Sequence, residues 1–252
     1  MTQILRTWRG PILLVVGLVI VWQMLYWIAG DMAMRSPLQT VSITADLLAG
    51  EMLRPHLAET MYAFAIAVFF AVTIGVATGL VFGLSRLASD IFEPMLVAIY
   101  SIPKLALYPI LLLTFGLGMS AKVAFGAIHG IIPIALFSIN AIRNIRPILI
   151  KTGRVLNYSP VEMAWHILVP AALPEIFTGI RIGFALTLIG TLLGEMFASQ
   201  RGLGNVLMRA IGLHNVDLIM AITFMLTTVA AVASGILLLI DTKLRRRAAV
   251  AD

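Results

Sequence analysis

Long apolar runs, separated by short polar segments, dominate the chain. A helix needs about 20 apolar residues to cross the hydrocarbon core of a bilayer. We therefore expect about six transmembrane helices, at approximately residues 11–30, 60–85, 94–115, 123–142, 171–197 and 218–240. The third run is interrupted, because Lys104 lies inside it between two prolines. The longest outer connection holds residues 40–46, which could form a short amphipathic helix. The pattern predicts an all-α polytopic membrane protein with one domain over residues 1–252.

The composition excludes the main alternatives to a membrane protein. Of the 252 residues, 60% are hydrophobic and 12% are charged, and the mean hydropathy is +1.01. A soluble domain is about 45–50% apolar and about 25% charged, so a soluble enzyme and a disordered chain are both excluded. Cysteine is absent and the four histidines lie far apart in the sequence. We therefore expect no disulfide framework and no metal site.

The basic residues predict the orientation of the spans. If the N-terminus is inside, 11 of the 18 Lys and Arg residues fall in inner segments, five in outer segments and two within spans. Cytoplasmic loops of membrane proteins are enriched in Lys and Arg. We therefore expect both termini in the cytoplasm. This distribution also accounts for the net charge of +6 without a nucleic-acid partner.

Glycines recur at spacings that place them on one face of a helix. The second span carries three and the fifth span four: Gly75, Gly79, Gly83, Gly179, Gly183, Gly190 and Gly194. Small residues let helices approach closely in lipid. The glycines therefore predict helix packing, either within one subunit or along a dimer seam or moving interface.

Residues 143–170 are too polar to span the membrane and too apolar for a plain linker. Ser159, followed by Pro160 and Glu162, has the spacing of a capping box at the start of a helix. We expect two short amphipathic helices that break near Asn157, with Pro170 and Pro174 ending the second and starting the fifth span. Such a segment could lie in the lipid headgroups or dock a cytoplasmic partner.

This segment resembles the "EAA" loop of binding-protein-dependent ABC importer permeases. The match begins at Lys151-Thr152-Gly153, continues through Asn157 and ends at residues 167–170 (ILVP). Further stretches resemble the nitrate/sulfonate/taurine permease subfamily: residues 98–109 (AIYSIPKLALYP), 115–118 (FGLG), 170–174 (PAALP), 178–183 (TGIRIG), and 194–195 (GE) followed by 201–204 (RGLG). The resemblance covers the chain from about Pro55 to Arg247.

The loop departs from the family pattern at four positions. Lys151 replaces Glu, Thr152 and Gly153 replace two Ala, and Asn157 replaces Gly. Asn tolerates a left-handed backbone better than most residues, so Asn157 can take the place of the turn glycine. Lys151 reverses a charge, which implies that the ATPase of this protein differs at the contact.

The resemblance implies a type I ABC importer permease fold in the bacterial inner membrane. Two copies would form the pore within the lipid bilayer, and a periplasmic or lipid-anchored binding protein would deliver the substrate. Two copies of a separate ABC ATPase, which would bind ATP and Mg, would dock on the coupling loop. The loop residues implicated are Lys151, Thr152, Gly153, Asn157, Ser159, Glu162 and Pro170. The substrate would be a small anion: nitrate, a sulfonate, a taurine-like solute or a related organic acid. The chain has no G-x-x-x-x-G-K-[ST] phosphate loop, so we expect no enzyme activity and no cofactor in this subunit.

Polar residues within spans are the candidates for a pathway or gate, because charge in the membrane is costly and often functional. They are Lys104, His129, Asn140 and Glu195. Each also has a simpler interpretation. Lys104 could snorkel or pair with Glu93, His129 could be packed in the protein, and Glu195 could be an interfacial charge close to Arg201.

Two other classes of function fit the sequence less well. An ion-gradient-driven secondary transporter usually contains internal repeats and buried acidic relays, and neither is evident in the sequence. An intramembrane enzyme would need a catalytic pair at membrane depth, and none is apparent.

Overall fold

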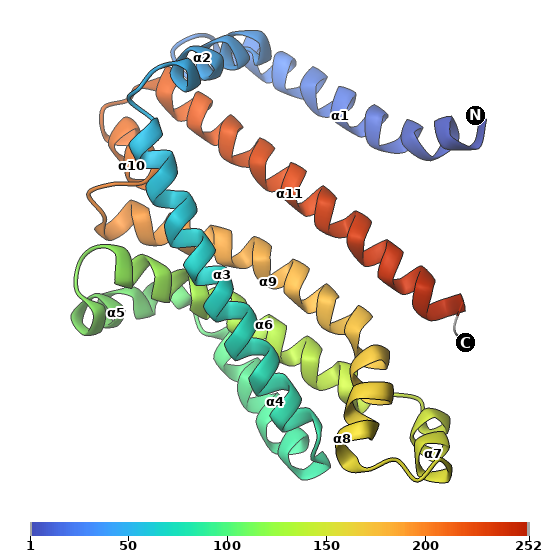
Figure 1. Ribbon diagram of the computed structural model, residues 1–252. Coiled ribbons are helices and arrows are strands. Elements are labelled where there is room, and N and C mark those ends of the chain that lie inside the picture. The colour runs from blue at the N-terminus through green and yellow to red at the C-terminus, as the bar shows by residue number, and fades with distance from the viewer. Residues whose placement is uncertain (1, 251–252) are drawn as a thin grey trace.

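Helix α6 (Met119–Arg143) lies at the centre of the chain, between α3 (Arg54–Gly83) and α9 (Val169–Ala198). The computed structural model describes residues 2–250, and within them all regular structure is helical (Figure 1). The remaining elements are α1 (Thr2–Ala29), α2 (Pro37–Ala49), α4 (Arg86–Ser101), the 3₁₀ helix η1 (Lys104–Leu107), α5 (Tyr108–Phe115), α7 (Pro147–Val155), α8 (Pro160–Met163), the π-helical turn η2 (Ala164–Leu168), α10 (Leu203–Gly212) and α11 (Val216–Val250).

The helices confirm the predicted all-α membrane fold. Five helical runs are long and apolar enough to cross a bilayer, and a sixth span arises if α4 and the η1–α5 segment count as one. These two pieces are bent by 85° at the break that contains Pro103. The third apolar run is therefore a broken span or a re-entrant loop. A proline frees backbone groups and cannot donate an N–H, which is consistent with a break at this point.

The glycines of α3 and α9 allow their backbones to approach α6. A Cβ atom built at Gly79 would lie 2.2 Å from Cβ of Ser138, and one built at Gly183 would lie 2.4 Å from Cγ1 of Ile134. The same construction brings all seven predicted packing glycines within 3.1 Å of an α6 atom. On the α6 side of the contact, Gly126 and Gly130 face Thr191 and Thr187 of α9. The glycines therefore lie at contacts within one subunit.

Helix α2 is the short helix expected near residues 40–46, and it packs against both α1 and α11. Ser36 and Gln39 form a capping box at its start. Arg35 forms ion pairs with Asp31 and with Asp217 in the first turn of α11. The hydrogen bond to Asp217 raises the pKa of the Arg35 guanidinium above its ordinary value. From this junction α1 and α11 diverge (Figure 1). The apolar stretch Ile12–Ala29 of α1 contains no buried residue, which suits a helix surrounded by lipid.

Pro170 lies in the first turn of α9, as expected for the start of the fifth span, but the expectation that Pro170 and Pro174 end the preceding short helix is wrong. The helical run continues without interruption from Pro160 through α8, η2 and α9 to Ala198. In η2 the N–H of Val169 donates to the carbonyl of Ala164, which is the wider hydrogen-bond spacing of a π-turn. A proline in a regular helix collides with the carbonyl four residues before it. The wider turn directly before Pro170 relieves this collision, so that the helix continues.

The glycine contacts predict that Gly79→Ala destabilises the protein by about 1–3 kcal/mol, because the added methyl group would overpack the α3–α6 contact. The measurement is the unfolding temperature of the purified chain in detergent. Gly235→Ala in α11 is the matched control, since a Cβ there meets nothing within 4 Å. This control should unfold at the same or a slightly higher temperature, because Ala is a better helix former than Gly. Equal losses in the two variants would contradict the packing role of Gly79.

Candidate functional site

The turn between α7 and α8 has the left-handed residue expected from the sequence. Asn157 has φ 55°. Its N–H donates to the carbonyl of Arg154 (3.0 Å), and the N–H of Tyr158 donates to the carbonyl of Gly153 (3.0 Å). These two bonds form a Schellman motif, which ends a helix at a left-handed residue. Asn157 thus occupies the conformation for which the family pattern carries glycine.

The capping box at the start of α8 is confirmed. The N–H of Ser159 donates to Oε2 of Glu162 (2.8 Å), and the N–H of Glu162 donates to Oγ of Ser159 (3.3 Å). Because the Schellman motif and the capping box are only two residues apart, little of the turn is left without a backbone hydrogen bond.

Gly153 joins the two short helices into one hairpin. It is the only buried residue of α7. A Cβ built there would lie 2.6 Å from Sδ of Met163 and 2.7 Å from Cδ1 of Ile167. Any larger side chain would therefore have to displace the side-chain ends of Met163 and Ile167. Thr152, by contrast, is exposed, and its hydroxyl donates to the carbonyl of Ile148.

The outer surface of this hairpin combines apolar side chains with cations. Val155 is 80% exposed and Trp165 is 68% exposed, and Ile148, Leu156 and Val161 are exposed as well. Lys151 and Arg154 are exposed among them, and within residues 2–250 neither forms an ion pair. Pro170 is exposed at the start of α9. This mixed surface suits a protein partner, because a helix lying in lipid separates its apolar and charged faces.

Lys104 lies at the break between α4 and η1. Its Nζ donates to the carbonyl of Tyr100 (3.0 Å) and lies 4.2 Å from the centre of the Tyr100 ring. The pairing with Glu93 that the sequence allowed is wrong. Glu93 instead binds Arg143 of α6 (2.7 Å), which also pairs with Asp90 (3.0 Å). Arg143 is a closer partner because α4 packs along α6 at this end.

Within the described residues, none of the other candidate pathway residues shares a hydrogen bond or an ion pair with Lys104. His129 is half-buried in α6, where Nδ1 lies 2.7 Å from the carbonyl of Phe125 and the ring packs edge-on against Phe125. Asn140 is half-buried one turn before the end of α6. Among the described residues, no hydrogen bond or ion pair joins any two of Lys104, His129, Asn140 and Glu195. Their roles in a pathway remain predictions.

Glu195 is fully enclosed within the subunit, with an exposed fraction of 0%. Its Oε2 accepts hydrogen bonds from the Thr60 hydroxyl (2.8 Å) and from the N–H of Gly204 (3.0 Å). Lys122 Nζ lies 3.7 Å from Oε1. The cation nearest to Glu195 is therefore Lys122 of α6, and not Arg201 as the sequence suggested.

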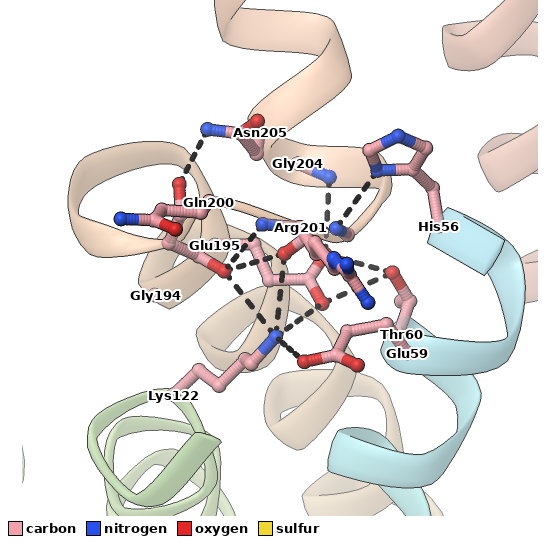
Figure 2. Close-up of polar contacts among 12 residues, drawn as sticks. His56, Glu59, Thr60, Lys122, Gly194, Glu195, Gln200, Arg201, Gly204 and Asn205 are labelled. Carbon is pink, nitrogen blue, oxygen red and sulfur yellow. Dashed lines mark hydrogen bonds and ion pairs between the residues drawn. The ribbon is translucent and has the colours of Figure 1, made fainter. Parts of the chain in front are cut away.

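Lys122 binds the turn between α9 and α10 as well as Glu195 (Figure 2). Only 1% of this residue is exposed. Its Nζ donates to Oε1 of Glu59 (2.9 Å), to Oγ of Ser199 (3.3 Å) and to the carbonyl of Arg201 (3.3 Å). A buried charge is stable only when it is paired and hydrogen-bonded, and here three donors have three acceptors. We call this group, formed by His56, Glu59, Thr60, Lys122 and Glu195, the polar cluster.

One part of the polar cluster was predictable from the sequence. The motif of Gly194-Glu195 followed by residues 201–204 (RGLG) contains the carboxylate and the turn that surrounds it. His56, Glu59 and Thr60 had no such signal, because they lie about 135 residues away in the chain. Lys122 had no signal of its own either, because its acidic partners lie on α3 and α9.

Comparison with known proteins identifies the family. The sequence model of the family described as "Binding-protein-dependent transport system inner membrane component" matches residues 71–250. The chain is 28% identical over 229 residues to the taurine transport system permease protein TauC of Escherichia coli (strain K12), with 85% of this chain and 83% of that protein covered. It is 24% identical over 239 residues to the putative aliphatic sulfonates transport permease protein SsuC of Bacillus subtilis (strain 168), with 94% and 87% covered.

The fold is similar to that of a chain from the MetNI methionine ABC transporter in an inward-facing conformation. The TM-score is 0.63 at 18% sequence identity, with 79% of this chain and 99% of that chain covered. The family match spans well over half of the sequence. The chain therefore belongs to the binding-protein-dependent transport system inner membrane components, the permease subunits of ABC importers.

Proposed function

We propose that this permease imports a small anionic solute as one half of a homodimeric pore. Two copies of a separate ATPase bind ATP and Mg and dock on the hairpin of α7, α8 and η2, and an external binding protein delivers the solute. The chain itself hydrolyses no ATP and carries no cofactor. The observation that carries this proposal is the hairpin, whose exposed surface combines apolar side chains with Lys151 and Arg154, which form no ion pair within residues 2–250.

The hairpin is built to transmit a push from a docked ATPase to the membrane helices. Its two arms are held together at Gly153. Helix α6 enters it within four residues and α9 leaves it without a break. Because α3 and α9 pack on α6 through glycines, a displacement of the hairpin moves these three helices as one body. Switching by rigid-body motion of packed helices is a common form of conformational change.

Charge supports a cytoplasmic position for the hairpin. Arg143, Arg146, Lys151 and Arg154 lie in or beside it, and residues 245–247 add three arginines near the end of α11. The positive-inside rule places such segments in the cytoplasm. Both termini then lie inside, and the polar cluster lies at the outer ends of α3, α6 and α9.

The substrate class rests on the relatives and on Lys104. The relatives are named for taurine and for aliphatic sulfonates, and both kinds of solute carry a sulfonate group. Lys104 supplies a half-buried cation at a break in a span. The start of the η1–α5 segment adds the positive end of a helix dipole at the same place. His129 and Asn140 are the further candidates for lining the pathway.

Reconstitution into liposomes with the cognate ATPase and binding protein tests the proposed function. We expect uptake of a labelled sulfonate, and this uptake should require ATP, Mg and the binding protein. Other small anions should compete with the sulfonate and reduce its uptake according to their affinity for the binding protein. Uptake by the permease alone, driven by an ion gradient and indifferent to ATP, would instead identify a secondary transporter.

The turn of the hairpin gives a local test of the docking site. Asn157→Ile should weaken ATPase binding about tenfold, because a β-branched residue at positive φ costs roughly 1–2 kcal/mol or more. Asn157→Gly is the control and should bind as the wild type does, since glycine adopts this conformation freely. The affinity of the ATPase is measured on permease that is held in nanodiscs and immobilised on a sensor surface. Equal ATPase affinity of the isoleucine and glycine variants would exclude this turn from the dock.

A further inference from the structure

We propose that Glu195 is a positioning residue, which fixes the α9–α10 turn as part of the outer surface on which the binding protein docks. The inference rests on the proposed function, because it needs an external binding protein and the orientation argued above. It assigns a role to the polar cluster, which the coupling loop and the candidate pathway leave unexplained.

The polar cluster and the hairpin lie at opposite ends of the same helices. Thr60 is in the second turn of α3, Lys122 is in the first turn of α6 and Glu195 is in the last turn of α9. From Lys122 to Arg143, beside the hairpin, α6 rises about 30 Å. Figure 1 shows α10 and α7 at opposite ends of the molecule. The α9–α10 turn is therefore on the side away from the ATPase.

The start of α10 is held by side chains of other helices. Its N-cap, Gly202, provides no side-chain cap. Instead, the N–H of Gly202 donates to Nδ1 of His56 (3.1 Å), that of Leu203 to Oγ of Thr60 (2.8 Å) and that of Gly204 to Glu195 (3.0 Å). The first N–H groups of a helix need such acceptors. Side chains of α3 and α9 thus supply the acceptors for three consecutive N–H donors.

The turn wraps tightly around the Glu195 carboxylate (Figure 2). Gly202 has φ 120°, and a Cβ built there would lie 2.2 Å from Cδ of Glu195. A Cβ at Gly204 would lie 2.4 Å from the carbonyl of Leu192. The two glycines of the RGLG motif are therefore required by the carboxylate and by the end of α9. This accounts for the pairing of Gly194-Glu195 with residues 201–204 in one motif.

Lys122 fixes the other half of the turn, at Ser199 and Arg201. The same ammonium lies between Glu59 and Glu195. Removing the Glu195 charge therefore alters both halves of the turn at once, since Lys122 loses one of its two counter-ions and the first N–H groups of α10 lose an acceptor. Thr60 links the halves, because its hydroxyl donates to Glu195 and accepts from Leu203.

The turn lines an open cavity of about 550 Å³, whose lining is partly apolar and partly polar. Its lining includes Glu59, Gln200, Arg201 and Asn205, and of these Gln200 and Arg201 are exposed. Charges of both signs and an amide-rich rim do not suit lipid tails. They suit the polar rim of an interface with a water-soluble protein, which at this end of the permease is the binding protein.

The test compares Thr60→Val with Thr60→Ser in the reconstituted complex of permease, ATPase and binding protein. Valine keeps the shape of threonine but removes the hydroxyl, whereas serine keeps the hydroxyl. We expect Thr60→Val to raise the concentration of loaded binding protein at half-maximal ATPase stimulation about tenfold, the usual loss for a hydrogen bond to a charged group. The rate at saturating binding protein should stay within about twofold of wild type. Thr60→Ser should match the wild type in both quantities.

A superimposable titration for Thr60→Val and wild type would overturn the proposal. If Thr60→Val does not assemble, the double variant Gln200→Ala with Arg201→Ala decides the question, because both side chains are exposed. This variant should show the same shift in half-maximal concentration, and a wild-type titration would again overturn the proposal. Absence of any stimulation in the wild type would contradict the proposed function itself, which distinguishes the two failures.

Discussion

The close approach of α3 and α9 to α6 is the contact on which the other features depend. Lipid tails are as apolar as leucine, so helices in a membrane gain little from burying apolar surface and associate through van der Waals contact and hydrogen bonds. Seven glycines on α3 and α9 bring backbone against α6, and Gly126 and Gly130 of α6 bring it against α9. These contacts hold α3, α6 and α9 together as a frame, which fixes the position of the hairpin at one end and of the polar cluster at the other.

The frame of α3, α6 and α9 connects the hairpin at its inner end to the polar cluster at its outer end, and the two ends have different functions. At the inner end, α6 and α9 flank the hairpin, so its position and that of the two helices change together. At the outer end, contacts of Glu195 with Lys122 and Thr60 link α9 to α6 and α3. A buried charge that loses its partner is strongly destabilising. The outer ends are therefore expected to stay together while α4, η1 and α5, whose span is already broken, provide the more adaptable part of the subunit.

Local and periodic features of this fold were predictable from the sequence. The apolar runs indicated the helices, the spacing of Gly75, Gly79 and Gly83 indicated a packed face, and Ser159 with Glu162 indicated a cap, because each depends on residues only a few positions apart. Features that depend on long-range contact were not predictable. Lys122 and Thr60 become a cluster only when α3 and α6 meet. Pro170 was expected to end a helix, yet the π-turn before it lets the helix continue. Arg143 took the partner expected for Lys104 because α4 packs beside α6.

The claim that α3 and α6 move as one body during transport can be measured directly with a disulfide. The chain contains no cysteine, so the double variant Gly83→Cys with Ile142→Cys could form only one disulfide bond, between these two positions. A Cβ built at Gly83 lies 3.1 Å from Cβ of Ile142, near the roughly 3.5–4.5 Å that a disulfide spans. If the two helices move as one body, the oxidised variant will transport substrate at the rate of its reduced form. Loss of transport on oxidation, with recovery on reduction, would show that the two helices must separate and would contradict the account.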